Sequence, residues 1–140
     1  IADMRITHKD GYFTTKNGSQ WPRVPQEKIW IVADGNFIGA INFRPVVHKM
    51  LENYGGHAGY SITPSARNKG YMTKALGLLL SDKDRMTKLD RDYMIVTTGS
   101  DNAASQKTIT NNGGVFIADF YSEEMQLDRQ VYHIPLKRGL

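Results

Sequence analysis

A basic, glycine-containing turn between two regular elements is the part of this sequence that points most directly to chemistry. The run from Ile62 to Thr73 reads ITPSARNKGYMT and places Arg67 and Lys69 just ahead of Gly70. The first N–H groups of a helix lack intrahelical partners and carry partial positive charge, so a helix beginning here would attract an anion. The two cations would add formal charge, and the glycine would let a phosphate approach the backbone closely. Taken alone, the run is equally consistent with an ordinary surface turn.

Other chemistries are limited by what the sequence lacks. Neither G-x-x-x-x-G-K-[ST] nor G-x-G-x-x-G occurs, which disfavours a nucleoside triphosphatase and a dinucleotide-dependent dehydrogenase. The chain has no cysteine, which excludes a cysteine nucleophile, disulfides and zinc–thiolate sites. His8, His48 and His133 show no metal-ligand spacing, so the sequence predicts no metal site.

The elements that would position the turn follow from the apolar pattern. Runs rich in β-branched and aromatic residues predict strands at 28–33, 37–44, 57–63, 93–98, 115–121 and 129–136. Asp34-Gly35-Asn36 joins the first two runs as a hairpin turn. Apolar residues at helical spacing predict a helix over 68–81, and Asp101 or Asn102 caps a second helix that ends near residue 112. Residues 45–54 are expected to form a loop with a short helical turn. This order predicts a mixed sheet carrying helices, of the α/β or α+β class.

The composition indicates one domain over residues 1–140, since 40% hydrophobic and 23% charged residues are near the globular average. No apolar run approaches the ~20 residues of a membrane-spanning helix, and residues 1–9 lack the layout of a signal peptide. Together with the missing cysteines, this predicts a cytoplasmic chain. The first residue is Ile1 rather than Met, which fits a fragment or a processed chain. The net charge of +4 fits either an anionic ligand or a nucleic-acid surface.

Two ordered motifs carry a resemblance to a known family. The spacing I-x-P-x-x-R-x-x-G-x-x-T, from Ile62 to Thr73, resembles the acyl-CoA pyrophosphate loop of the GNAT superfamily of acetyltransferases. Asn102-Ala103-Ala104-Ser105, followed by Asn-Asn-Gly-Gly at 111–114, resembles the superfamily's N-x-x-S/A helix and its glycine exit. The run YGGHAGY at 54–60 is similar to a bacterial branch known only as predicted acetyltransferases. The resemblance covers 24–114 in motif and extends to residue 136 in strand order.

The resemblance implies a mixed, mostly antiparallel, splayed sheet flanked by helices. The strand ending at Thr63 would pair its backbone with the pantetheine arm of acetyl-CoA, the implied co-substrate. The implied activity is transfer of an acetyl group to a primary amine of a small molecule or peptide; a homodimer would fit the superfamily, and no membrane partner is expected. The implied acetyl-CoA-binding residues are Ile62, Thr63, Arg67, Asn68, Lys69, Gly70, Tyr71, Met72, Thr73, Asn102 and Ser105.

The sequence departs from the family pattern at three places. Met72 stands where the family usually has Gly or Ala, and its bulk would crowd the phosphates unless it turns into the core. Ile109 stands where many relatives have a tyrosine general acid. The sequence ahead of the hairpin is weakly patterned, so we expect the first strand and helix of the family to be missing.

For the transfer itself, direct attack of the amine on the thioester is the simplest scheme, because no cysteine can carry the acetyl group. An alkyl ammonium must first lose a proton, and His57 is the first candidate base because imidazole titrates near neutrality. The alternative is a structural histidine. Tyr60 and Glu52 are weaker catalytic candidates, and a backbone N–H of the strand at 57–63 is the candidate donor to the oxyanion.

Two other function classes stay open. Met72 and Ile109 are compatible with a domain that binds acyl-CoA without catalysis. The positive charge is compatible with a nucleic-acid-binding domain, whose affinity would fall steeply with salt. Against the latter, no reader motif is present and the aromatic residues are not interleaved with Lys or Arg, so we do not expect a nucleic-acid partner.

Overall fold

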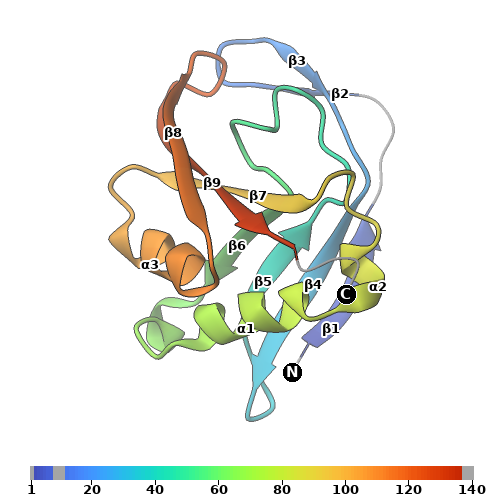
Figure 1. Ribbon diagram of the computed structural model, residues 1–140, viewed down its shortest axis with the longest axis vertical. Helices are drawn as coiled ribbons and strands as arrows, with labels where there is room; N and C mark the ends of the chain where they lie inside the picture. The colour runs from blue at the N-terminus through green and yellow to red at the C-terminus, as the bar shows by residue number, and fades with distance from the viewer. Residues whose placement is uncertain (1, 8–11, 137–140) are drawn as a thin grey trace.

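The computed structural model describes the backbone of residues 2–7 and 12–136, and the side chains of residues 12–136. The strands in these ranges are β1 (Ala2–Thr7), β2 (Tyr12–Thr14), β3 (Gln20–Pro22), β4 (Gln26–Ala33), β5 (Asn36–Phe43), β6 (Ala58–Ile62), β7 (Tyr93–Gly99), β8 (Val115–Ser122) and β9 (Leu127–Pro135). The α-helices are α1 (Tyr71–Leu80), α2 (Lys83–Met86) and α3 (Ala103–Asn111), and a 3₁₀ turn, η1, covers Pro64–Ala66. None of these helices has both the length and the apolar character needed to cross a membrane. The expected α/β (α+β) class is confirmed (Figure 1).

The first sheet has the antiparallel order β1-β4-β5-β6. Its centre is the predicted hairpin of β4 and β5, and the turn takes positive φ at Asp34 (52°) and Gly35 (79°). β1 pairs with β4 from Ala2 opposite Ile31 to Thr7 opposite Gln26. A strand therefore does precede the hairpin, where the weak sequence pattern predicts none.

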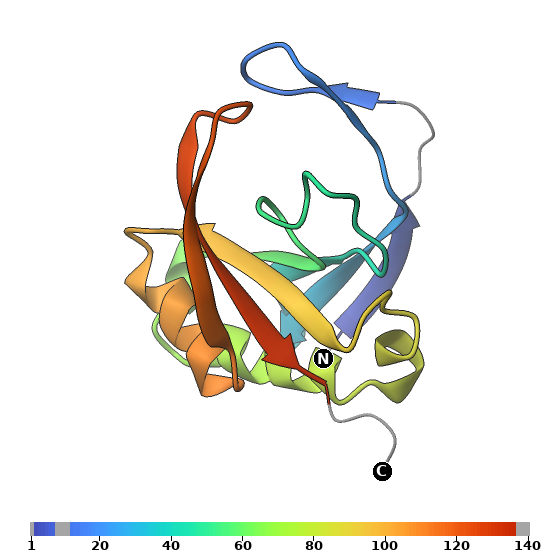
Figure 2. The same cartoon turned by 45° about the horizontal axis from the view of Figure 1, so that its top comes forward.

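The second sheet has the antiparallel order β7-β9-β8, so the last strand of the chain lies between the other two. A two-stranded ribbon of β2 and β3 lies beyond the sheets. Figure 2 shows the two larger sheets splaying apart, with the green loop of residues 45–56 between their upper ends. The expected splayed sheet flanked by helices is confirmed, and residues 45–54 form a loop with short hydrogen-bonded turns, as expected.

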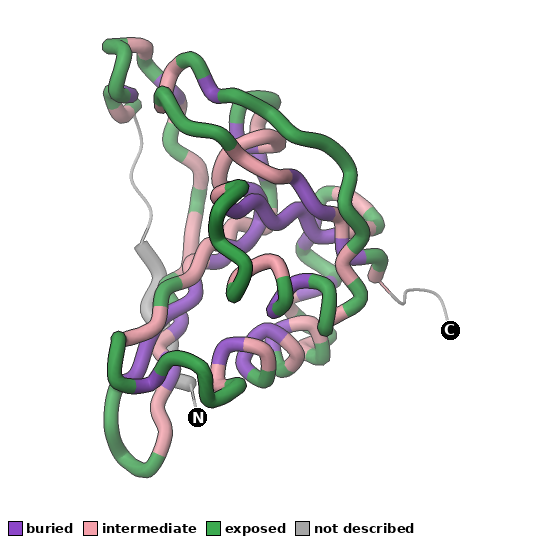
Figure 3. The backbone as a smooth tube through the Cα atoms, turned by 90° about the vertical axis from the view of Figure 1, so that its left-hand side faces the viewer, coloured by how far each residue is buried: buried purple, intermediate pink, exposed green. Residues whose placement is uncertain are grey.

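The main core lies between α1 and the two sheets. Ile41 and Phe43 of β5 pack in one cluster with Leu76 and Leu79 of α1, and Figure 3 shows the buried stretches gathered where the sheets and α1 meet. Leu76 has no exposed surface. Burial of such side chains stabilises the fold by about 1.5–3 kcal/mol each. α1 is thereby fixed across the end of β6, which leads into it.

A second core supports the 45–56 loop. Val47 and Leu51 of the loop pack with Trp21 of β3, Ile95 of β7 and Val131 of β9. The loop is therefore held between the second sheet and the β2–β3 ribbon, and its position is set by contacts with segments far away in the sequence.

Candidate functional site

The backbones of the two sheets come together at a joint where His57 faces Ile95. β6 ends the first sheet and β7 ends the second. His57, just before β6, donates its backbone N–H to the carbonyl oxygen of Ile95 at 2.8 Å, and the Ile95 N–H donates to Nδ1 of His57 at 2.8 Å. In the part of the chain that the structure describes, no ladder continues from this joint. β6 and β7 therefore diverge and leave two open strand edges.

A glycine is required beside the joint. Gly56 has φ of 59°, a conformation that side chains disfavour, and a Cβ at this position would lie 2.3 Å from the carbonyl oxygen of Ile95. The N–H of Gly56 donates to the carbonyl oxygen of Leu51 at 2.8 Å. The Gly55-Gly56 pair thus lets the 45–56 loop reach β7 closely.

The ring of His57 is buried and both of its nitrogens have partners. Because the Ile95 N–H donates to Nδ1, the ring proton lies on Nε2, which donates to Oδ1 of Asp90 at 2.8 Å. Burial lowers the pKa of His57, against the opposing effect of Asp90. The hydrogen bonds from Arg91 and His57 outweigh partial burial and hold the pKa of Asp90 at about 2.

This geometry argues against the expected role of His57 as general base. The side chain is 0% exposed, so no substrate amine can reach either nitrogen. His57 instead joins the 45–56 loop, β7 and the segment before β7. Asp90, the partner that fixes its tautomer, carries no signal in the sequence, because the two residues are 33 positions apart.

One edge of β6 is open to a ligand. The Arg44 N–H donates to the carbonyl oxygen of His57, and the Thr63 N–H donates to that of Ile38, so the odd-numbered residues of this strand bond to β5. By the alternation of an antiparallel ladder, Ala58, Tyr60 and Ile62 direct their backbone polar groups away from β5. An extended ligand with amide groups could add to this edge as a strand does.

The turn after β6 leads to an uncapped helix N-terminus. Asn68 and Gly70 both have positive φ, at 61° and 79°, and therefore α1 begins at Tyr71, later than the predicted start at 68. Gly70 is the N-cap and no side chain caps the helix. A Cβ on Gly70 would meet nothing within 4 Å, so the approach to the free N–H groups is open.

Two cations flank this N-terminus. Arg67 and Lys69 are exposed, and the structure gives neither an ion pair with any described carboxylate. Nε of Arg67 donates to the carbonyl oxygen of Ile62 at 3.3 Å, which holds the guanidinium near the end of β6. Free N–H groups, an open glycine and two cations fit the pyrophosphate of a CoA-type ligand.

Met72 points away from the turn. Its side chain is buried in the main core with Ala75 and Leu76. The bulk that the sequence places beside the phosphates therefore packs against the first sheet, and the turn stays open.

The second motif lies on α3 and faces β6. Asn102 is the N-cap of α3, and its Oδ1 accepts the N–H of Ser105 at 3.1 Å. The hydroxyls of Ser105 and Tyr60 lie 2.8 Å apart, and burial raises the pKa of Tyr60. Oγ1 of Thr73 donates to Oγ1 of Thr108 at 3.4 Å, which ties α1 to α3. The structure thus brings together the end of β6, the start of α1 and the start of α3.

The other sequence candidates lie away from this site. Glu52 accepts from Arg91 at 2.6 Å, His48 contacts the carbonyl oxygen of Pro22 at 2.9 Å, and His133 stacks on Tyr93. His8 lies outside the described residues. Ile109 is fully buried in the main core. Among the described residues, no cluster of His, Asp and Glu could hold a metal.

A cavity of about 650 Å³ lies on the face of the first sheet opposite α1. Asn42 and Arg44 line it, and they alternate along β5 with Ile41 and Phe43, which face the main core. The other lining residues come from β2, the 22–26 segment and the 45–56 loop, and they are Phe13, Pro22, Arg23, Val24, Gln26, Leu51, Tyr54 and Gly55. Sequence reasoning missed this cavity, because its walls come from distant segments.

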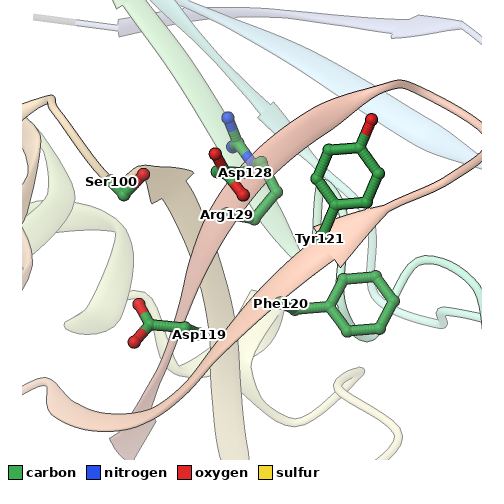
Figure 4. Close-up of a pocket in the computed structure, with 6 residues that line it drawn as sticks. All are labelled: Ser100, Asp119, Phe120, Tyr121, Asp128 and Arg129. Carbon is green, nitrogen blue, oxygen red and sulfur yellow. The ribbon is translucent and has the colours of Figure 1, made fainter.

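A smaller pocket of about 360 Å³ lies along the β8–β9 hairpin beside Ser100. Figure 4 shows Asp119 and Phe120 projecting to opposite sides of β8, with Asp128 and Arg129 on the neighbouring strand. None of its lining residues belongs to the 62–73 turn or to the 102–105 motif.

The comparisons with known proteins agree with this arrangement. The family model described as an acetyltransferase (GNAT) domain matches residues 6–115. No curated protein matches the chain. RimL, a ribosomal L7/L12 alpha-N-protein acetyltransferase in complex with coenzyme A, is similar with a TM-score of 0.65 and 16% identity, covering 81% of this chain and 64% of that one.

Two further structures share the fold. RimJ from Mycobacterium smegmatis, in complex with a CoA disulfide, has a TM-score of 0.62 and 20% identity over 79% of this chain and 53% of that one. A mutant of the spermidine N-acetyltransferase SpeG from Vibrio cholerae has a TM-score of 0.58 and 13% identity over 79% of this chain and 65% of that one. The chain thus spans less than two thirds of the length of each of the three structures. With the family model covering most of its residues, this chain belongs to the acetyltransferase (GNAT) domain family.

Proposed function

We propose that this chain transfers an acetyl group from acetyl-CoA to a primary amine. The observation that carries the proposal is the continuity between the open edge of β6 and the uncapped N-terminus of α1, joined by the turn that holds Arg67 and Lys69. An amide-containing arm and a pyrophosphate are the two parts of CoA that such a surface can bind.

At the phosphate end, the free N–H groups of Tyr71, Met72 and Thr73 would bind the pyrophosphate oxygens. Arg67 and Lys69 would add charge-assisted hydrogen bonds. Positive φ at Asn68 and Gly70 shapes the turn so that the backbone can face the ligand. The pantetheine arm would be flanked by Ile62 and Thr63 at the end of β6. It would also contact Asn102 and Ser105 at the start of α3.

The transfer step would be a direct attack. The neutral amine forms a C–N bond to the thioester carbonyl, the C–S bond breaks, and solvent takes the ammonium proton. A backbone N–H on the open edge of β6, from Ala58 or Tyr60, would stabilise the negative charge developing on the carbonyl oxygen. The hydroxyl of Tyr60 stays protonated because burial raises its pKa, and it would donate a hydrogen bond to the departing sulfur.

The cavity beside β5 would hold the acceptor amine. It adjoins β6 through Arg44, whose Nη2 would lie 3.2 Å from a Cβ added at Gly59. The amine would then approach the thioester from the face opposite α1. A cytoplasmic location and a homodimer stay predictions from the sequence.

Calorimetric titration with acetyl-CoA, CoA and ADP tests the cofactor site. We expect acetyl-CoA to bind and Arg67→Gln to weaken binding by about tenfold, the cost of one charge-assisted hydrogen bond. Lys83→Gln, which removes an exposed cation from α2, is the charge-matched control. Free-thiol release with a panel of amines then tests catalysis, and a chain without cysteine adds no background.

The outcomes separate the candidate functions. Binding of acetyl-CoA without thiol release from any amine would favour a non-catalytic acyl-CoA-binding module, for which the buried Ile109 is the supporting observation. Failure to bind acetyl-CoA together with salt-sensitive binding of nucleic acid would overturn the proposal.

A further inference from the structure

The cavity that would hold the acceptor has an unbalanced charge. Arg23 and Arg44 line it, and no Asp or Glu does. Glu52, in the same loop as Tyr54 and Gly55, is paired with Arg91 at 2.6 Å. A cationic ligand in this cavity would therefore meet like charges without a carboxylate to offset them.

Arg44 is a largely buried cation held by neutral groups only. Nε donates to the carbonyl oxygen of Gly56 at 2.8 Å, Nη2 to that of Gly55 at 2.9 Å, and Nη1 to Oε1 of Gln26 at 3.0 Å. Among the described residues it forms no ion pair, and burial lowers its pKa. Arg44 thus holds the Gly55-Gly56 turn in place and leaves an unpaired positive charge in the wall of the cavity.

Arg129 of β9, which lines the smaller pocket, brings a third guanidinium next to Tyr54, a residue that lines this cavity. Its Nη2 donates to Oγ1 of Thr97 at 3.1 Å, and the N–H of Gly55 donates to the same oxygen at 2.9 Å. The guanidinium lies over the ring of Tyr54, 5.0 Å from its centroid. Its Nε is buried and has no hydrogen-bond partner. Among the described residues, neither Asp119 nor Asp128 forms an ion pair with Arg129, although both line the smaller pocket with it.

We infer that the acceptor of this chain is an amine that also carries an anionic group, and that Arg23, Arg44 and Arg129 form the subsite for that group. The inference rests on the proposed function and adds the substrate class. Guanidinium groups bind carboxylate and phosphate oxygens through paired N–H donors. Arg23 and Arg129 carry positive charge that forms no ion pair with a described carboxylate, Arg23 stands at the exposed side of the cavity, and Arg44 holds the turn in place.

The three arginines are far apart in the sequence, at the ends of different elements. Arg23 follows β3, Arg44 follows β5, and Arg129 lies in β9. Tyr54 and Gly55 lie between them, because Arg129 stacks on Tyr54 while Arg44 donates to Gly55. An anion seated against Tyr54 and Gly55 would therefore face two of the three cations directly.

The test uses pairs of acceptors that differ only in charge. Amino acids and short acidic peptides are compared with their neutral amides as acetyl acceptors. Spermidine serves as the cationic acceptor for comparison, and thiol release gives kcat and KM for each. We expect the acidic member of a pair to have the higher kcat/KM, through a lower KM. Arg129→Gln and Arg23→Gln should each lower kcat/KM for the acidic member by roughly ten- to hundredfold and leave its neutral partner unchanged. Arg129→Lys should restore part of the loss, and Lys83→Gln should have no effect.

A direct binding measurement covers acceptors that turn over slowly. The CoA complex is titrated with N-acetylated acidic products and with their amides, and the acidic products should bind more tightly in the native chain than in the Arg129→Gln variant. If no acidic member is acetylated or bound better than its neutral partner, or if spermidine is preferred, the inference is overturned while acetyl-CoA binding and acetyl transfer stand. Loss of acetyl-CoA binding in the native chain would instead remove the proposed function on which it rests.

Discussion

His57 and Ile95 exchange two hydrogen bonds, from the His57 N–H to the Ile95 carbonyl oxygen and from the Ile95 N–H to Nδ1 of His57, each at 2.8 Å. Here Nδ1 of the His57 ring takes the place of a backbone carbonyl as the acceptor for the Ile95 N–H. From this point β6 and β7 diverge. The imidazole ring of His57 is therefore one of the contacts that set the position of the open edge of β6 relative to β7.

Replacing His57 by Ala should lower the free energy of unfolding by about 2–4 kcal/mol, because it leaves the buried Ile95 N–H without its partner, removes one of several hydrogen bonds to the Asp90 carboxylate and creates a cavity at a buried site. Urea unfolding measures the loss. If His57 acts as a positioning residue, the variant's remaining activity keeps the pH profile of the native chain. Loss of the acidic limb of that profile would show instead that His57 accepts the amine's proton.

The stability of the chain should fall in two steps as the solution becomes acidic. Below about pH 6.5, histidine in the unfolded chain takes up a proton while His57, whose pKa is lowered by burial, stays neutral, so the free energy of unfolding decreases. Below about pH 4, aspartate in the unfolded chain is protonated while Asp90, with its pKa at about 2, stays ionised, and stability decreases again. Urea unfolding across this range measures both steps, and an NMR titration of the His57 ring showing a pKa above that of a free histidine would contradict the first.

Gly56→Ala should disrupt the joint. The added Cβ would lie 2.3 Å from the Ile95 carbonyl oxygen at a positive φ, so the loop must shift, at a cost of about 3 kcal/mol or more. Gly18→Ala is the matched control, because Gly18 also has positive φ but a Cβ there meets nothing within 4 Å. We expect the control to cost about 1 kcal/mol. Equal losses in thermal unfolding would mean that φ alone matters and that the close approach to β7 does not.

Tyr60→Phe tests the proposed donor to the departing sulfur. Removing the hydroxyl breaks its hydrogen bond with Ser105 and should cost about 1 kcal/mol of stability. If the hydroxyl also acts on the leaving group, kcat falls by roughly tenfold or more with KM for acetyl-CoA little changed. Ser105→Ala keeps the Tyr60 hydroxyl and should reduce kcat less. An unchanged kcat in Tyr60→Phe would assign the ring to packing only.

Met72→Ala should destabilise the chain without improving the cofactor site. Met72 packs with Ala75 and Leu76 in the main core, so truncation leaves a cavity that costs about 2–4 kcal/mol. The Kd for acetyl-CoA should stay the same. Lys69→Gln is the complementary variant, expected to weaken acetyl-CoA roughly tenfold with no loss of stability. Tighter acetyl-CoA binding by Met72→Ala would show that the methionine crowds the turn after all.

Elements with strong local signals could be predicted from the sequence. The β4–β5 hairpin follows from its Asp34-Gly35-Asn36 turn, and α3 follows from the Asn102 cap and the glycines after it, because these signals act between neighbouring residues. The predicted start of α1, at residue 68, lies three residues before the observed one, since positive φ at Asn68 and Gly70 is a property of the folded turn.

Elements that depend on distant partners could not be predicted. β1 is stabilised by pairing with β4, more than 15 residues away along the chain, and the β2–β3 ribbon packs on the 45–56 loop through Trp21. Their sequences are weakly patterned, and strand propensity reflects the neighbours that a strand meets more than the strand itself.

The sequence by itself determined the residue types at the turn: two cations and a glycine at fixed spacing, with no cysteine to carry an acyl group. These depend on residue order alone. Only the tertiary structure decided that His57 is a buried joint rather than an accessible base, and that Met72 faces the core. It also decided that Arg23 and Arg44 share a cavity with Tyr54, on whose ring Arg129 stacks. The physical reason is that burial, hydrogen-bond partners and electric field at a side chain are set by segments that meet only when the sheets pack together.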